Sequence, residues 1–296
     1  MSTQHKYAGT GVAIVTPFTS DLSIDFKGLE KQIEHLIANG INYLIVLGTT
    51  GESVTQSDAE KEELVRFIKE KVNHRIPIVL GLGGNNTQAV IDKIKKTDFT
   101  GIDAILSVAP YYNKPTQEGL YQHFKAIAKA CPIDIILYNV PGRTGSNIKA
   151  ETTLKLAHEF NNIVAVKEAS GDFSQAMYIV KDKPENFVII SGEDALTLPL
   201  MSAGVSGVIS VVANAFPKEF STMVQLALNN DFKEAEKIHY QLLEFIDTLF
   251  VEGNPGGIKE ALSILGIIEN NLRLPLVKVS EATHQKLEEL INNIKA

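Results

Sequence analysis

One lysine stands where its amine could act as a nucleophile. It ends the segment 163–167, whose first four residues, Ile-Val-Ala-Val, are apolar and predict a strand buried on both faces. Burial disfavours the charged form of an amine, and the neutral form can attack a ketone to give a Schiff base. Because side chains alternate along a strand, we expect Ile163, Ala165 and Lys167 to share a face, where the small Ala165 leaves room beside the amine. The simpler alternative is a lysine whose stem packs on the sheet while its ammonium reaches water.

Hydroxyl and phenol groups follow other apolar segments. Thr49 and Thr50 lie between glycines in Gly-Thr-Thr-Gly-Glu-Ser, so their backbone N–H groups and hydroxyls could hold a carboxylate. Tyr138 ends an apolar segment, and a buried phenol there could relay a proton. Tyr111 and Tyr112 are adjacent and point in different directions, so one could pack while the other presents its hydroxyl. The structural alternatives are a glycine-rich turn before a helix for the threonines and interface or loop packing for the tyrosine pair.

An arginine and two more polar segments complete this set. Arg143 lies in Pro-Gly-Arg-Thr-Gly, and its guanidinium suits bidentate binding of a carboxylate, with a surface ion pair as the alternative. Segments 191–194 (Ser-Gly-Glu-Asp) and 207–210 (Gly-Val-Ile-Ser) end two further apolar runs. An amine, phenols, hydroxyls, an arginine and anion-binding backbone at one predicted edge together favour a Schiff-base site.

Eight short apolar segments supply the elements that must position these groups. Longer segments with helical spacing lie between them. Strands that alternate with helices predict a parallel (β/α)8 TIM barrel, an α/β fold whose chemistry sits at the carboxyl ends of the strands. An open doubly wound sheet is the alternative, but no Gly-x-Gly-x-x-Gly follows the first strand. The predicted strands are 12–18, 43–48, 76–83, 104–110, 134–140, 163–167, 187–192 and 207–212.

After Pro217 the strand signals stop. Four helical segments follow, at 220–228, 232–249, 258–265 and 280–296. We expect the first to be the last barrel helix and the others to form an appended helical domain. The predicted domains are therefore a catalytic barrel over residues 1–229 and a C-terminal helical domain over residues 230–296.

Composition limits the class of protein. The 296 residues can bury a sizeable core, and 28 Lys and Arg against 35 Asp and Glu give a net charge of −7, without a basic patch for nucleic acid. Cys131 is the only cysteine, which excludes intramolecular disulfides and suits a reducing cytoplasm. The 7 histidines are scattered without a metal-binding spacing, so we expect no metal and no cofactor. Without a signal-peptide pattern or a membrane-spanning run, we expect a soluble cytoplasmic protein.

Five motifs together resemble the dihydrodipicolinate synthase family over essentially the whole chain. They are 48–53 (Gly-Thr-Thr-Gly-Glu-Ser), 111–115 (Tyr-Tyr-Asn-Lys-Pro), 138–145 (Tyr-Asn-Val-Pro-Gly-Arg-Thr-Gly), 166–170 (Val-Lys-Glu-Ala-Ser) and 207–211 (Gly-Val-Ile-Ser-Val). The first and fourth also resemble the wider pyruvate-dependent class I aldolases, which include N-acetylneuraminate lyase. The resemblance implies a lyase, by classification a hydro-lyase, that condenses pyruvate with L-aspartate 4-semialdehyde in lysine and diaminopimelate biosynthesis.

The resemblance also implies the catalytic roles. Lys167 would form an imine with pyruvate, and the enamine derived from it would attack the aldehyde. Tyr138 would pass protons through the Thr49 hydroxyl to Tyr112, and this last phenol would enter from a neighbouring subunit. A homotetramer built as a dimer of dimers is therefore expected, because the shared site requires at least the tight pair.

Substrate binding and inhibition follow from the same resemblance. The Thr49–Thr50 backbone and the Thr50 hydroxyl would hold the carboxylate of pyruvate, and the Ile209 carbonyl would lie beside it. Arg143 would bind the carboxylate of the semialdehyde. Members inhibited by lysine carry acidic and imidazole side chains in a dimer cleft where this chain has Lys61 and Ala89, although Asn85 and Tyr111 remain compatible. We therefore expect inhibition by lysine to be weak or absent.

Two other functions compete with this one. A different pyruvate-releasing aldolase, such as N-acetylneuraminate lyase or a 2-keto-3-deoxy sugar acid aldolase, would have less use for a second carboxylate clamp at Arg143. A barrel that binds keto acids without turnover, as a sensor or scaffold, would form no covalent adduct on Lys167.

Overall fold

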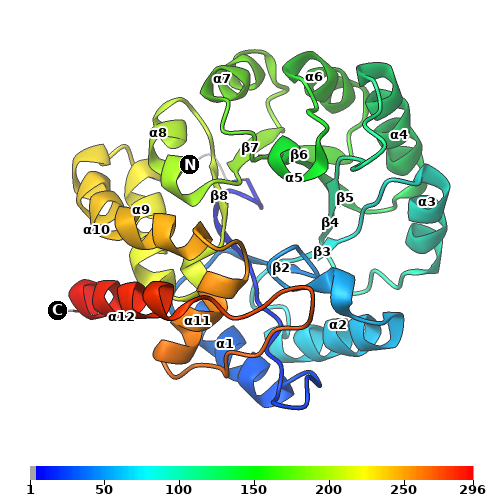
Figure 1. Ribbon diagram of the computed structural model, residues 1–296. Helices are drawn as coiled ribbons and strands as arrows, with labels where there is room; N and C mark the ends of the chain where they lie inside the picture. The colour runs from blue at the N-terminus through cyan, green and yellow to red at the C-terminus, as the bar shows by residue number, and fades with distance from the viewer. Residues whose placement is uncertain (1–4, 296) are drawn as a thin grey trace.

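The computed structural model describes residues 5–295, and its strands form a closed barrel. β1 to β8 pair in chain order and β8 pairs with β1, always in parallel. Figure 1 shows the strands at the centre with helices around them. The predicted (β/α)8 barrel is confirmed. The strands are β1 (Gly9–Ala13), β2 (Tyr43–Val46), β3 (Ile78–Gly81), β4 (Ala104–Val108), β5 (Asp134–Asn139), β6 (Ile163–Glu168), β7 (Val188–Ser191) and β8 (Gly207–Ser210).

The first strand was predicted too late in the chain. The segment 12–18 is wrong beyond its first two residues, because β1 ends at Ala13. The Gly-Thr-Gly that opens β1 carries no apolar signal, yet a glycine is needed there: a Cβ on Gly11 would lie 2.2 Å from the ring of Tyr43. The apolar residues after β1, such as Ile14, are buried in the outer core under the helices instead.

The strand that carries the lysine is irregular at its start. Ile163 pairs with Ile135, but Ala165 pairs with Ile136, so the register between β5 and β6 shifts by one residue. Ile163 therefore packs in the outer core, whereas Ala165 packs inside the barrel. The prediction that Ile163 shares a face with Ala165 and Lys167 is wrong, because the irregularity breaks the alternation of side chains.

The two ends of the barrel interior hold side chains of different size. Tyr7 precedes β1 and Tyr43 begins β2, and both side chains are fully buried with ring centroids 5.9 Å apart. These rings close the amino end of the barrel. Farther along β6 the inner position is the small Ala165, and Lys167 follows it at the carboxyl end.

Helices cover the strands on the outside. Several begin at a side-chain cap, as in α2, where Ser57 and Glu60 form a reciprocal capping box. Each such cap fixes where its helix begins. The helices are α1 (Phe26–Ala38), α2 (Asp58–Val72), α3 (Thr87–Lys96), α4 (Gln117–Ala130), α5 (Pro141–Thr144), α6 (Ala150–Glu159), α7 (Phe173–Asp182), α8 (Thr197–Ser202) and α9 (Pro217–Leu228), with 3-10 turns η1 (Ser53–Thr55), η2 (Asp194–Leu196) and η3 (Val212–Asn214).

Three further helices follow the barrel: α10 (Phe232–Phe250), α11 (Gly256–Ile264) and α12 (Glu281–Lys295). In Figure 1, α10 lies beside α9, and α12 lies against α10 and α11. The orange segment between α11 and α12 extends toward α2, where Arg273 pairs with Glu60. Among residues 5–295, no helix combines the length and the apolar character that crossing a membrane requires. The C-terminal region thus reaches from the side of the barrel to a loop at its carboxyl end.

Candidate active site

Lys167 lies at the carboxyl end of β6, and its side chain points into that end of the barrel. The residue is 6% exposed, and its Nζ atom lies 4.4 Å from the centroid of the Tyr138 ring. The two residues are register partners on neighbouring strands, so the sheet itself holds the phenol beside the amine. The structure therefore brings these two predicted site residues together.

The loop after β7 closes over the stem of the lysine. A Cβ on Gly192 would lie 3.0 Å from Cε of Lys167 and 2.5 Å from Cβ of Ala169. Only glycine permits this approach, because any larger residue would displace the lysine stem or the backbone beside it. Gly192 thus defines one wall of the space around the amine.

Two acidic residues follow Gly192 in the same loop. Asp194 is buried, and its carboxylate accepts hydrogen bonds from the backbone N–H groups of Val211 (2.9 Å) and Val212 (3.0 Å), which fixes the loop after β8. Burial raises the pKa of Asp194. Glu193 is exposed, yet partial loss of water around its carboxyl, and then the neighbouring Asp194, raise its pKa, while the positive charges of Lys167 and Arg143 oppose that rise. Glu193 is therefore within electrostatic reach of both cationic site residues.

Arg143 lies on the short helix α5 and is exposed. The hydroxyl of Thr144 holds this turn by donating to the carbonyl groups of Val140 (3.2 Å) and Ser146 (2.9 Å). The exposed guanidinium can receive a carboxylate from solvent while its backbone stays fixed.

A buried polar network supports β5 and β6 from the outside. Glu168, next to the lysine, is 3% exposed and accepts hydrogen bonds from the Asn139 amide (3.0 and 3.1 Å) and the Gln175 amide (2.9 Å). It also accepts from the backbone N–H of Ser170 at 2.8 Å. Because alternate residues of β6 point in opposite directions, this network holds the strand without entering the space around Lys167.

The threonine pair after β2 is divided between the interior and the surface. Thr50 is 2% exposed and its hydroxyl accepts a hydrogen bond from the side-chain amide of Asn254 at 3.0 Å, whereas Thr49 is exposed. The carbonyl of Gly51 accepts from Thr16 and Gln56, both at 2.7 Å, which holds the turn against the barrel. Asn254 was not predicted from the sequence.

The remaining predicted residues lie on the loop after β4 and on β8. Tyr112 is 89% exposed and has a left-handed backbone, with φ of 72°. Its N–H donates to the Thr144 carbonyl at 3.2 Å, so this loop rests on the loop that carries Arg143. Within the described part of the chain, no hydrogen bond joins the hydroxyls of Tyr138, Thr49 and Tyr112. Ile209 is buried in the inner cluster of the barrel.

The arrangement suits covalent chemistry at an amine. Lys167 is shielded from bulk water, a phenol lies against it, and Arg143 offers a positive charge within reach of the same acidic loop. Such groups can form an imine with a keto acid and move protons beside it. In residues 5–295, no three His, Cys, Asp or Glu side chains gather in a way that could hold a metal ion.

Comparison with known proteins points to one family. The model of the dihydrodipicolinate synthetase family matches residues 6–294. A 4-hydroxy-tetrahydrodipicolinate synthase from Parabacteroides distasonis is 53% identical over 286 residues, which cover 97% of this chain and 96% of that protein. The crystal structure of a dihydrodipicolinate synthase from Thermotoga maritima has a TM-score of 0.96 at 41% identity and covers 98% of this chain and 99% of that one. A dihydrodipicolinate synthase from Acinetobacter baumannii, solved with pyruvate, has a TM-score of 0.94 at 40% identity, with coverage of 97% and 99%.

Proposed function

Since the chain belongs to the dihydrodipicolinate synthetase family, we propose that it condenses pyruvate with L-aspartate 4-semialdehyde through a Schiff base on Lys167. The observation that carries this proposal is the 6% exposed lysine at the carboxyl end of β6, with its Nζ 4.4 Å from the centre of the Tyr138 ring. The reaction is a step of lysine and diaminopimelate biosynthesis, and the enzyme is a lyase of the class I aldolase type.

The first half of the reaction makes a carbon nucleophile. The unprotonated amine of Lys167 attacks the ketone carbon of pyruvate, and loss of water leaves an imine. The protonated imine then withdraws electrons, so that the pyruvate methyl group loses a proton and an enamine forms. Tyr138 lies beside the amine and is placed to take part in these proton transfers, with Thr49 and Tyr112 as the next groups of the relay.

The second half joins the substrates and frees the enzyme. The enamine carbon attacks the aldehyde, which forms the new C–C bond, and the resulting alkoxide takes a proton. The amino group of the semialdehyde portion then attacks the imine carbon and displaces Lys167, which closes the ring.

Carboxylate recognition uses two separate places. The turn at Thr49 and Thr50 presents N–H groups and a buried hydroxyl for pyruvate, beside the Ile209 carbonyl. The exposed Arg143 receives the carboxylate of the semialdehyde. Pyruvate and the semialdehyde each bring one carboxylate, which matches these two positions. A substrate whose second half is a neutral sugar chain matches them less well.

We place this activity in a cytoplasmic homotetramer, a dimer of dimers in which Tyr112 enters the partner's site. Tyr112 is 89% exposed and Tyr111 is 43% exposed in the single chain, and Val54 on the loop after β2 is 90% exposed. Large side chains exposed to solvent on two loops at the carboxyl end of the barrel support a subunit contact there.

Reductive trapping tests the proposal. Borohydride added with pyruvate should fix one reduced pyruvate on Lys167, located by mass spectrometry of the peptide, and Lys167→Ala should lose both the adduct and turnover. Lys233→Ala, which removes an exposed lysine of α10, is the matched control and should keep both. An unmodified Lys167 in the wild-type protein would refute the proposal. A coupled assay with aspartate semialdehyde and with N-acetylneuraminate then distinguishes the synthase from the lyase.

A further inference from the structure

A buried ion pair lies between α11 and the loop that follows β2. The Lys259 ammonium lies 2.5 Å from a carboxylate oxygen of Glu52, and both side chains are 0% exposed. Lys259 also donates to the carbonyl of Asn271 at 2.8 Å, and its Nζ lies 4.2 Å from the centroid of the Phe18 ring. These contacts join the C-terminal region to the barrel inside the protein rather than on its surface.

Glu52 belongs to the turn that carries Thr49 and Thr50. Its backbone has a left-handed conformation, with φ of 53°, which a residue with a side chain adopts only when its surroundings hold it there. The backbone N–H of Glu52 donates to the carbonyl of Thr49 at 3.0 Å, which closes the turn over the two threonines. The position of the Glu52 side chain therefore fixes the backbone that presents the threonine N–H groups.

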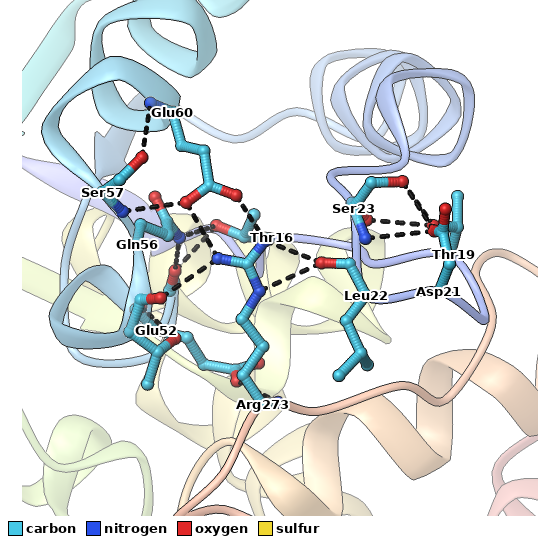
Figure 2. A network of polar contacts seen from close by, with 12 residues as sticks. Thr16, Thr19, Asp21, Leu22, Ser23, Glu52, Gln56, Ser57, Glu60 and Arg273 are labelled. Atoms are coloured by element: carbon cyan, nitrogen blue, oxygen red, sulfur yellow. Dashed lines mark hydrogen bonds and ion pairs between the residues drawn. The ribbon is translucent and has the colours of Figure 1, made fainter.

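The segment after α11 holds the other oxygen of the same carboxylate. The backbone N–H of Arg273 donates to Glu52 at 3.2 Å, and the Arg273 side chain spans to the carbonyl of Leu22 and to Glu60 in the first turn of α2. Figure 2 shows Arg273 at the centre of these contacts, with Glu52, Gln56 and Glu60 around it. Asn254, just before α11, adds a third link through the Thr50 hydroxyl.

Stability alone does not account for the ion pair. Burial lowers the pKa of Lys259 to about 8, even though Glu52 acts in the opposite direction. Keeping the Lys259 ammonium charged inside the protein therefore costs free energy of desolvation. Buried ion pairs are often no more stabilising than apolar residues of the same volume, although they define geometry closely. A fixed geometry for the turn is what this pair supplies.

We infer that Lys259 and Glu52 act as positioning residues for pyruvate, which makes the C-terminal helical region part of the site that binds its carboxylate. This inference rests on the proposed function, since it names what holds the turn at Thr49 and Thr50. It assigns a role to residues that touch neither the substrate nor Lys167.

The experiment measures the pyruvate concentration that gives half-maximal borohydride trapping on Lys167. In Lys259→Met, which keeps the length of the side chain without its charge, this concentration should rise about 10-fold or more, because the turn loses its anchor. The KM for aspartate semialdehyde should stay within about twofold, since Arg143 lies on a different loop. The matched control is Lys71→Met, which removes a partly exposed ammonium 2.8 Å from Glu30 and should leave the pyruvate response unchanged.

A second variant keeps the test decisive if Lys259→Met does not fold with an unpaired Glu52. The double variant Glu52→Gln with Lys259→Met leaves no buried charge, and we expect the same loss of pyruvate affinity in a folded protein. A folded single or double variant whose half-saturating pyruvate stays within about twofold of wild type would overturn the inference, as would an equal rise in KM for both substrates. Failure of the wild-type protein to form any adduct would instead overturn the proposed function.

Discussion

At the scale of single residues, the reactivity of Lys167 depends on what lies beside its side chain. Tyr138 covers one side, with its ring centroid 4.4 Å from Nζ, and Gly192 lies so close on another side that a Cβ there would be only 3.0 Å from Cε. The amine is thereby held in one place and shielded from bulk water. Lys167 and these two neighbours come from β6, β5 and the loop after β7, so the environment of the lysine exists only once these strands have assembled in the barrel.

Replacing the phenol tests its part in proton transfer. We expect Tyr138→Phe to lower kcat by about 10²- to 10³-fold, because it removes a hydroxyl that exchanges protons next to the imine, while the KM for pyruvate changes little. Steady-state kinetics with both substrates provides the measurement. Tyr178→Phe alters a tyrosine that is 60% exposed on α7 and should behave as wild type. An unchanged kcat in Tyr138→Phe would remove Tyr138 from the relay.

The response to lysine is a second prediction about single side chains. In the dimer cleft that the family resemblance implies, the ammonium of Lys61 on α2 would repel the ammonium groups of lysine, and the exposed Ala89 on α3 would offer no carboxylate to bind them. We therefore expect no half-inhibition below about 1 mM lysine in a turnover assay. The double variant Lys61→His with Ala89→Glu should become more sensitive. Half-inhibition of the wild-type protein at micromolar lysine would contradict this prediction.

Sequence motifs indicated the residues next to the chemistry better than those that support them. Lys167 and Tyr138 lie near the ends of β6 and β5, and Arg143 lies on α5 shortly after β5, so their types and positions pointed to one edge of a barrel. Asn254 and Lys259 gave no such signal. They reach the loop after β2 from about 200 residues farther along the chain, and only the packing of α11 on the barrel brings them there.

At the scale of elements, the loop after β2 is held from two directions. The hydroxyl of Thr16, from the chain after β1, and the amide of Gln56 both bind the Gly51 carbonyl, and the segment between α11 and α12 binds the same loop from outside the barrel. The two errors in strand prediction also belong to this scale. The glycine at position 11 and the register shift near Ile163 both arise from contacts with a neighbouring strand. Hydrophobic periodicity within one segment cannot reveal such contacts.

Acid should weaken the contact between α2 and the C-terminal segment. The hydrogen bonds from Arg273 lower the pKa of Glu60 from 4.5 to about 2. Because the pKa is depressed in the folded state, the stabilisation is present above 4.5 and is lost as pH falls toward 2. Urea unfolding at about pH 6 should show Glu60→Gln less stable than wild type by about 1 kcal/mol, since the side chain is partly exposed.

The stability difference between Glu60→Gln and wild type, measured at two pH values, tests whether the charge of Glu60 maintains that contact. At about pH 3 the difference between Glu60→Gln and wild type should shrink, because Glu60 of the unfolded chain is then largely protonated and folding must release that proton. Glu63→Gln, on the same helix and 3.9 Å from Arg66, should show little difference at either pH. A deficit in Glu60→Gln that is as large at pH 3 as at pH 6 would show that the charge of Glu60 is not what matters.

At the scale of the whole molecule, one chain places Lys167 and Tyr112 in opposite surroundings. The amine is inside the barrel end, whereas the phenol is 89% exposed on a loop that rests against the Arg143 loop. A relay that includes both groups requires either a large movement of this loop or a phenol from a second copy. The proposed tight pair, with Tyr112 exchanged between its subunits, meets the requirement without movement.

Mixed dimers decide between these two arrangements. Lys167→Ala and Tyr112→Phe chains, coexpressed with different tags and purified through both, form pairs that contain one chain of each kind. If Tyr112 enters the partner's site, one site of each pair carries both changes and the other carries neither, so the pair should regain about half of the wild-type activity. If Tyr112 serves its own chain, every site keeps one defect and activity stays at the level of the single variants. Pairs of Lys167→Ala with wild type, purified in the same way, set the value expected for one intact site.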